Sequence, residues 1–161
     1  MACRLCHGHR PLRDSHIIPE FLYSSMYDEK HRFQVLSTGQ AQENRLSQKG
    51  VREKLFCDDC EQKFSKWERY VSLLLNGGAA IVSTQEGRLW HLSEIDYRQF
   101  RLFQLSVLWR ASVSTADFFQ NVSLGEHEEK LRKLLISSDT GLPWQYGCVI
   151  CVLIDDKAVL T

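Results

Sequence analysis

Apolar residues recur at helical spacing between residues 58 and 76. The steps are three and four, and the stripe they form consists of Phe64, Trp67, Val71, Leu74 and Leu75. Gly77 and Gly78 follow this segment, as residues that end a helix commonly do. The pattern therefore predicts one amphipathic helix over residues 58–76.

Two capping boxes predict where further helices begin. Ser93 and Asp96 have the required spacing, with Asp in place of the usual Glu, and an aromatic-rich run follows them. We expect a long, mostly buried helix over residues 96–113. Ser123 and Glu126 form a second box, and the shorter helix expected after it carries Leu131, Leu134 and Leu135.

Shorter patterns predict strands, a hairpin and a loop. Strands are expected over residues 15–18 and 51–56, and a hairpin over 79–92. Pro19 suits the first turn of a helix, so a short helix is expected over 19–27. The polar stretch 28–50 predicts a long loop. Together these elements predict an α+β protein.

Composition narrows the class of protein. The 161 residues are 43% hydrophobic and 25% charged, which is a globular balance, and the formal net charge is zero. Without a global basic field, contact with nucleic acid must come from a local patch. No apolar stretch reaches the ~18 residues of a membrane span, and the N-terminus lacks the apolar run of a signal peptide. We therefore expect a soluble, cytoplasmic protein that does not bind membranes.

Two Cys-x-x-Cys turns predict a metal site. Cys3 and Cys6 form one turn, Cys57 and Cys60 form the other, and 50 residues separate the two turns. Each turn can present two thiolates from one tight knuckle, and zinc prefers four soft ligands in a tetrahedron. Paired cysteines in a reducing compartment more often bind metal than form disulfides. We expect one structural Zn²⁺ bound by all four cysteines.

Two alternatives to this ligand set stay open. The cysteines could be ordinary buried residues, or His7 or His9 could replace one ligand. Cys148 and Cys151 share the spacing but lie in a continuous apolar run, which predicts a buried strand and a place in the core. The chain then ends where a returning strand would begin, so we expect a fragment of a longer protein.

A histidine motif between the cysteine pairs resembles a nuclease family. His16-Ile17-Ile18-Pro19 follows the first pair, and Leu55-Phe56 leads directly into the second pair, which opens the predicted helix. This order resembles the HNH endonucleases, also called His-Me finger or ββα-metal nucleases. The resemblance covers residues 1 to about 70. It implies a zinc-binding HNH-like module over residues 1–76, followed by an α+β region of unknown role over residues 79–161.

The resemblance also implies a reaction, the hydrolysis of DNA phosphodiester bonds with one Mg²⁺ or Mn²⁺, in which zinc is only structural. By position, His16 is the general base, a role that suits a free pKa of ~6.5. The family usually has Asp before this histidine, where the chain has Ser15, and Asn or His after the last cysteine, where it has Glu61. A carboxylate suits magnesium, so Glu61 is the second candidate catalytic residue. A glutamate early in a helix can also serve the helix dipole.

These departures leave a second function open, namely a catalytically inactive zinc-binding module that binds nucleic acid or a protein partner. The predicted helix 96–113 carries Arg98, Arg101 and Arg110. Arg98 and Arg101 share a face and could contact phosphates, but a solvated helix face is the favoured interpretation. No Gly-rich phosphate loop or dinucleotide fingerprint is present, so no nucleotide cofactor is expected. The family context would be phage or defence systems, and the oligomeric state stays undetermined. The histidines interpreted as surface residues are His7, His9, His31, His91 and His127.

Overall fold

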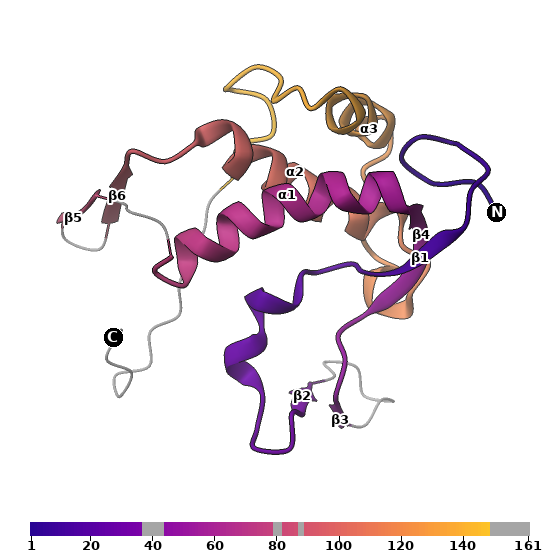
Figure 1. The fold of residues 1–161 in the computed structure, drawn as a ribbon, viewed down its shortest axis with the longest axis horizontal. Coiled ribbons are helices and arrows are strands. Elements are labelled where there is room, and N and C mark those ends of the chain that lie inside the picture. Colours follow the sequence, from indigo (N-terminus) through magenta and orange to yellow (C-terminus); the bar gives the residue numbers. More distant parts are fainter. Residues whose placement is uncertain (37–43, 79–81, 87–88, 149–161) are drawn as a thin grey trace.

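The structure is a computed structural model that describes residues 1–36, 44–78, 82–86 and 89–148. It has the α+β composition expected from the sequence, with three α-helices and three separate two-stranded sheets in these residues. The long helix α1 crosses the middle of the molecule, and α2 and α3 lie against one side of it (Figure 1). Within the described residues, no helix has the length and hydropathy needed to span a bilayer.

The N-terminal elements form a strand pair joined directly to a helix. Strand β1 (Leu12–His16) pairs antiparallel with β4 (Arg52–Cys57), and α1 (Asp58–Leu75) starts at the next residue. Four residues of the apolar stripe of α1 are buried as expected, namely Phe64, Trp67, Val71 and Leu74, whereas Leu75 is exposed. Asp58, Asp59 and Glu61 place negative charge in the first turn of this helix, where the helix dipole favours it.

A bulge interrupts the pairing of β1 with β4. Arg13 pairs with Phe56 and Asp14 pairs with Lys54, so Leu55 is an extra residue in β4. As a result, Leu55, Phe56 and Cys57 are buried in succession, which regular alternation in a strand does not allow. The backbone carbonyl of Leu55 accepts a hydrogen bond of 2.9 Å from the N–H of Arg4, so the bulge also anchors the N-terminal turn.

The segment between β1 and β4 differs from the expected long loop. It contains an antiparallel hairpin of β2 (Phe33–Val35) and β3 (Arg45–Ser47), so the prediction of a loop over residues 28–50 is wrong. The expected helix over residues 19–27 is instead two 3-10 turns, Glu20–Leu22 and Ser24–Met26. Strands of three residues are too short to produce a readable alternation, which is why the sequence pattern missed them.

The predicted elements of the C-terminal half are present with shifted caps. The hairpin consists of β5 (Val82–Glu86) and β6 (Leu89–Ser93), and α2 spans Tyr97–Val113. Asp96, not Ser93, caps α2, because its side chain accepts a hydrogen bond from the N–H of Gln99 while Ser93 still belongs to β6. Helix α3 spans His127–Ser137. The residue at its N-cap position, Glu126, makes no capping hydrogen bond with its side chain.

One hydrophobic core joins the two halves of the chain. Phe56 of β4 and Phe64 of α1 pack against Trp109 of α2, with ring centroids 5.8 and 6.5 Å apart. Leu131 and Leu135 of α3 belong to the same buried cluster. The division into a module over 1–76 and a region over 79–161 stays a prediction, but both parts contribute to this core.

The burial of two arginines and the exposure of one cysteine were not predicted from the sequence. Arg101 and Arg110 are buried, so the interpretation as a solvated helix face is wrong for Arg101. Arg101 donates to the backbone carbonyls of Thr140, Leu142 and Gln145, which ties the segment after α3 to α2. Cys148 is exposed and lies outside any strand, so its assignment to the core is wrong, and Cys151 lies outside the described residues.

Candidate functional site

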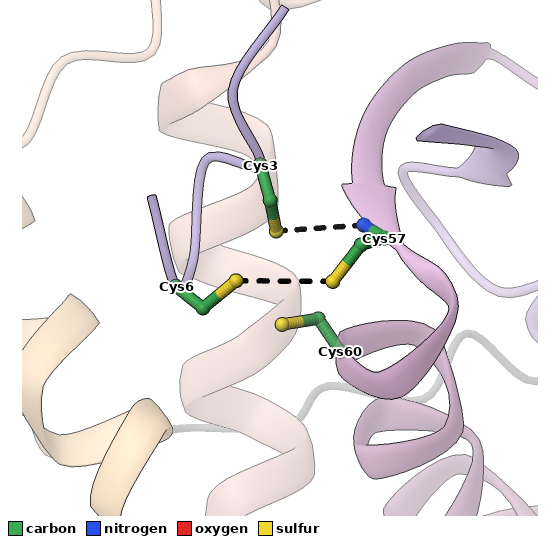
Figure 2. Close-up of side chains that lie close together, drawn as sticks. All are labelled: Cys3, Cys6, Cys57 and Cys60. Atoms are coloured by element: carbon green, nitrogen blue, oxygen red, sulfur yellow. Dashed lines mark hydrogen bonds between the residues drawn. The ribbon is translucent and has the colours of Figure 1, made fainter. Parts of the chain in front are cut away.

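The four predicted cysteines converge at one end of the β1–β4 pair. Cys3 and Cys6 lie on the N-terminal turn, Cys57 ends β4, and Cys60 lies in the first turn of α1. Their four Sγ atoms all lie within 4.8 Å of one another, and those of Cys6 and Cys57 are 3.8 Å apart (Figure 2). Cys3, Cys57 and Cys60 are buried, whereas Cys6 is exposed. A metal ion such as zinc can be held by this set.

Backbone N–H groups help to prepare the cluster for thiolates. The N–H of Gly8 lies 3.4 Å from the Sγ of Cys6, and the N–H of Cys57 lies 3.4 Å from the Sγ of Cys3. Burial raises the pKa of the Cys3 thiol, but backbone hydrogen bonds from Cys6, Cys57 and Leu5 bring that pKa down to about 7. Burial raises the pKa of Cys57 and Cys60. A divalent cation would supply the positive charge that four neighbouring thiolates require.

The turn that carries Cys3 and Cys6 is held from several sides. Its own backbone closes through a hydrogen bond of 3.0 Å from the N–H of Cys3 to the carbonyl of Gly8. Arg132 of α3 donates to the carbonyl of Leu5 at 2.7 Å, so α3 also braces the turn. The geometry therefore does not depend on the cysteines alone. His7 and His9 are exposed, and neither is a member of the cluster among the described residues.

His16 occupies the C-terminal end of β1. Its side chain is half-buried, and its backbone carbonyl accepts a hydrogen bond of 3.1 Å from Nη1 of Arg110. Burial lowers the pKa of His16, and the charge of Arg52 on β4 lowers it further. The carboxylates of Glu20, Glu68 and Asp14 act in the opposite direction. The net depression of this pKa favours the neutral imidazole, which is the form that accepts a proton.

Glu61 lies in the first turn of α1, on the side that faces β1. Its Oε1 atom is buried and has no hydrogen-bond partner among the described residues. Burial raises the pKa of Glu61, while hydrogen bonding to Ser15 and the charge of Arg110 lower it. Ser15 itself is only 3% exposed and stands in β1 beside His16. The structure therefore brings Ser15 and Glu61, the two departures from the HNH pattern, into one place.

Arg110 is a member of this site that the sequence did not identify. It reaches the end of β1 from α2 and forms an ion pair of 2.6 Å with Glu68 of α1. Its guanidinium also lies 5.2 Å from the ring centre of Phe64. The signal in the sequence was weak, since only the position of Arg110 directly after the apolar run Val107-Leu108-Trp109 set it apart from the other polar residues of the helix.

No second cluster of metal ligands accompanies His16. The four cysteines are the one group in the described ranges where three or more His, Cys, Asp or Glu side chains bring ligand atoms this close together. Magnesium in phosphoryl sites is commonly bound by only one or two carboxylates together with substrate oxygens. A catalytic divalent ion therefore does not require a cluster of that kind, and Glu61 is the candidate carboxylate.

A cavity of about 670 Å³ begins beside the end of β1. Its wall is largely apolar and includes the rings of Tyr23 and Phe33. Three cations, Arg45, Lys49 and Arg52, also line it, against the single carboxylate of Asp117. No pattern in the sequence predicts this cavity, because it forms between the β2–β3 hairpin and turns distant along the chain.

Comparisons of the chain with protein-family models, with curated proteins and with solved structures find no match in any of the three.

Proposed function

We propose that this protein is a metal-dependent endonuclease of the HNH type that hydrolyses DNA phosphodiester bonds. The observation that carries the proposal is the convergence on one β1–β4–α1 unit of a four-cysteine cluster, a histidine at the end of β1, and a carboxylate in the first turn of α1. The order of these features along the chain is the order in the family that the sequence resembles.

His16 is the proposed general base. Its lowered pKa favours the neutral form near pH 7, so that a ring nitrogen can take a proton from the attacking water. Glu61 would hold a Mg²⁺ or Mn²⁺ ion, which supplies charge neutralisation at the phosphate and the leaving oxygen. The buried Oε1 of Glu61 without a partner fits this role, because a buried carboxylate oxygen requires a hydrogen bond or a cation.

The cysteine cluster is the proposed site of structural Zn²⁺. Its ligands come from the turn before β1 and from the junction of β4 with α1, so the metal would link the N-terminal turn to the start of α1. In this role zinc contributes folding free energy and takes no part in the reaction. The basic residues of the adjoining cavity, Arg45, Lys49 and Arg52, supply the local positive patch that a neutral chain needs to bind DNA.

The test is cleavage of supercoiled plasmid by the purified protein in Mg²⁺ or Mn²⁺. We expect nicking that EDTA abolishes, and a loss of at least about 100-fold in His16→Ala, since a general base contributes roughly 10²–10⁴-fold. His127→Ala is the matched control, because His127 is exposed on α3. Glu61→Gln should retain zinc and fold but lose divalent-ion-dependent activity. Equal nicking by wild type and His16→Ala would contradict the proposal.

The alternative function, a zinc-binding module without catalysis, is favoured by one observation. Ser15 is buried in the position where the family has an acid, and the pKa of its neighbour Glu61 is raised by burial. A raised pKa weakens a carboxylate as a metal ligand. This alternative predicts DNA or protein binding that is indifferent to Mg²⁺ and to His16→Ala, with no cleavage by folded, zinc-loaded protein.

A further inference from the structure

The guanidinium of Arg110 is held where α2 meets the end of β1. It is 1% exposed, which places a permanent positive charge almost entirely inside the protein. Burial of an unpaired charge is strongly unfavourable, so the partners of a buried arginine identify what the position is for. We propose that Arg110 is a positioning residue for His16, so that α2 is part of the reactive site. This inference rests on the proposed nuclease function for its catalytic consequence.

The contacts of Arg110 join three elements at one point. Its Nη1 donates to the backbone carbonyl of His16 at 3.1 Å and to Oε1 of Glu68 at 2.6 Å. Its Nε donates to the carbonyl of Ser106 at 3.3 Å within α2, and its guanidinium lies over the ring of Phe64. One side chain thus ties β1, α1 and α2 together at the residue proposed to act as base.

A lysine cannot make the same set of contacts. The guanidinium is planar and presents its N–H groups in a fixed fork, which lets it stack on Phe64 while it donates to three acceptors. The lysine ammonium is a compact, strongly hydrated point charge that stacks less well. The geometry at Arg110 therefore requires arginine in particular, and not simply a positive charge.

Arg110 also balances the charges that act on the site. The groups facing His16 are Arg52 of β4, Glu20 of the first 3-10 turn, Asp14 of β1 and Glu68 of α1. Glu68 favours the protonated imidazole, and the ion pair with Arg110 offsets that carboxylate directly. The charge of Arg110 also favours the ionised form of Glu61. Arg110 thus acts on both candidate catalytic residues while remaining too buried to touch substrate.

The test compares the ring signals of His16 in NMR spectra of the whole zinc-loaded protein and its variants. Arg110→Met should raise the pKa of His16, because the charge of Glu68 is then no longer offset. Glu68→Gln should lower that pKa, because the positive charge of Arg110 is left without its counterion. The double variant should return toward the wild-type value. Arg98→Met, an exposed position on the same helix, is the matched control and should leave the ring signals unchanged.

Plasmid cleavage supplies the catalytic half of the test. We expect kcat to fall about 10- to 100-fold in Arg110→Lys, the effect of displacing a catalytic group by about an ångström. KM should change little, because Arg110 is buried and does not meet DNA. If Arg110→Met does not fold, the ring signals and the pKa of His16 are measured by NMR in Arg110→Lys and Glu68→Gln instead.

The two hypotheses fail in different ways. Variants that lower thermal stability but leave the ring signals and pKa of His16 unchanged would overturn the positioning role and make Arg110 purely structural. A wild-type protein that folds, binds zinc and never cleaves DNA would overturn the nuclease function instead. In that case the opposite pKa shifts in Arg110→Met and Glu68→Gln would still support the coupling of α2 to His16.

Discussion

The cysteine cluster and the His16 site share the same strands and helix but are built in different ways. The cluster draws its four ligands from two local turns, and all four sulfur atoms meet within 4.8 Å. The His16 site draws its charged groups from β1, β4, α1, α2 and a 3-10 turn, and two ion pairs, Arg110 with Glu68 at 2.6 Å and Arg52 with Asp14 at 3.0 Å, link these elements. The residues of a site made of local turns can be predicted from their spacing along the chain. The residues of a site made by packing depend on how the whole core is assembled.

Loss of a cluster ligand should have the largest effect. Cys57→Ser should abolish stoichiometric zinc binding and unfold the N-terminal turn and strand pair, because structural zinc supplies on the order of 10 kcal/mol in such sites. Zinc content by mass spectrometry and the circular dichroism melt measure this. Cys148→Ser is the control, since Cys148 is exposed and lies outside the cluster. Retention of one zinc per chain in Cys57→Ser would remove this cysteine from the ligand set.

A cavity in the shared core should disturb the His16 site but leave zinc binding at the cysteine cluster intact. Trp109→Ala should lower the free energy of unfolding by about 3–5 kcal/mol, because it leaves a cavity beside Phe56 and Phe64. Zinc binding should persist, because no cluster ligand comes from α2, whereas the His16 ring signals should change. Trp144→Ala is the control, since Trp144 is 77% exposed and should change stability by no more than about 0.5 kcal/mol. Urea unfolding supplies both values.

Loss of the contact between β4 and the end of α2 should have an intermediate, pH-dependent effect on the free energy of unfolding. Glu53 accepts hydrogen bonds from the side chains of Ser114 and Thr115 and from the N–H of Thr115. Burial raises the pKa of Glu53, but these hydrogen bonds more than offset burial and hold that pKa below the usual 4.5. The stabilisation is therefore present above pH 4.5 and is lost as the pH falls through the lower folded-state pKa.

The Glu53→Gln variant tests this linkage. It should reduce the free energy of unfolding by about 1–2 kcal/mol at pH 7. The difference from wild type should shrink as the pH falls below 4.5, where the wild-type carboxylate becomes protonated. Glu128→Gln, on the first turn of α3, serves as the control carboxylate. A deficit in Glu53→Gln that is independent of pH would show that the ionised form makes no special contribution.

Removal of the positive charge of Arg52 should have the smallest effect on the His16 site. The positive charge of Arg52 helps to lower the pKa of His16, so Arg52→Met should raise that pKa, and only modestly because Arg52 is partly solvated. The acid limb of the cleavage profile should move to higher pH by the same amount. Release of Asp14 from its ion pair with Arg52 acts in the same direction, so an unchanged or lower His16 pKa would show that the charge of Arg52 does not act on this ring.

The sequence predicted the parts of the fold whose signal is local. The stripe from Phe64 to Leu75 predicted α1, and Asp58 to Leu75 is its observed extent. The spacing of the four cysteines predicted that they converge, because two short turns need only be brought together once. The position of α2 was also predicted, although its cap was placed at Ser93 because the pattern could not show that β6 continues to that residue.

The parts that were missed depend on partners distant along the chain. Arg101 and Arg110 carry the charge of surface residues, and only the carbonyls and carboxylate that surround them explain their burial. The β2–β3 hairpin was missed because Phe33–Val35 and Arg45–Ser47 are too short to show a period. The Mg²⁺-binding role of Glu61 and the base role of His16 stay predictions. The structure describes the groups around these two residues, and a role in a reaction is tested only by activity measurements.

The extra residue in β4 limits how this chain can change during evolution. Beyond Leu55 the strand runs one step out of phase with β1, which lets Phe56 and Cys57 be buried while Glu53 reaches the end of α2. Deletion of any single residue between Glu53 and Cys57 would restore regular pairing. It would also turn either Glu53, or Phe56 and Cys57, to the opposite face of the strand pair. Substitutions are therefore far easier to accept here than changes of length. Related chains should vary in the β2–β3 hairpin and keep this count of residues constant.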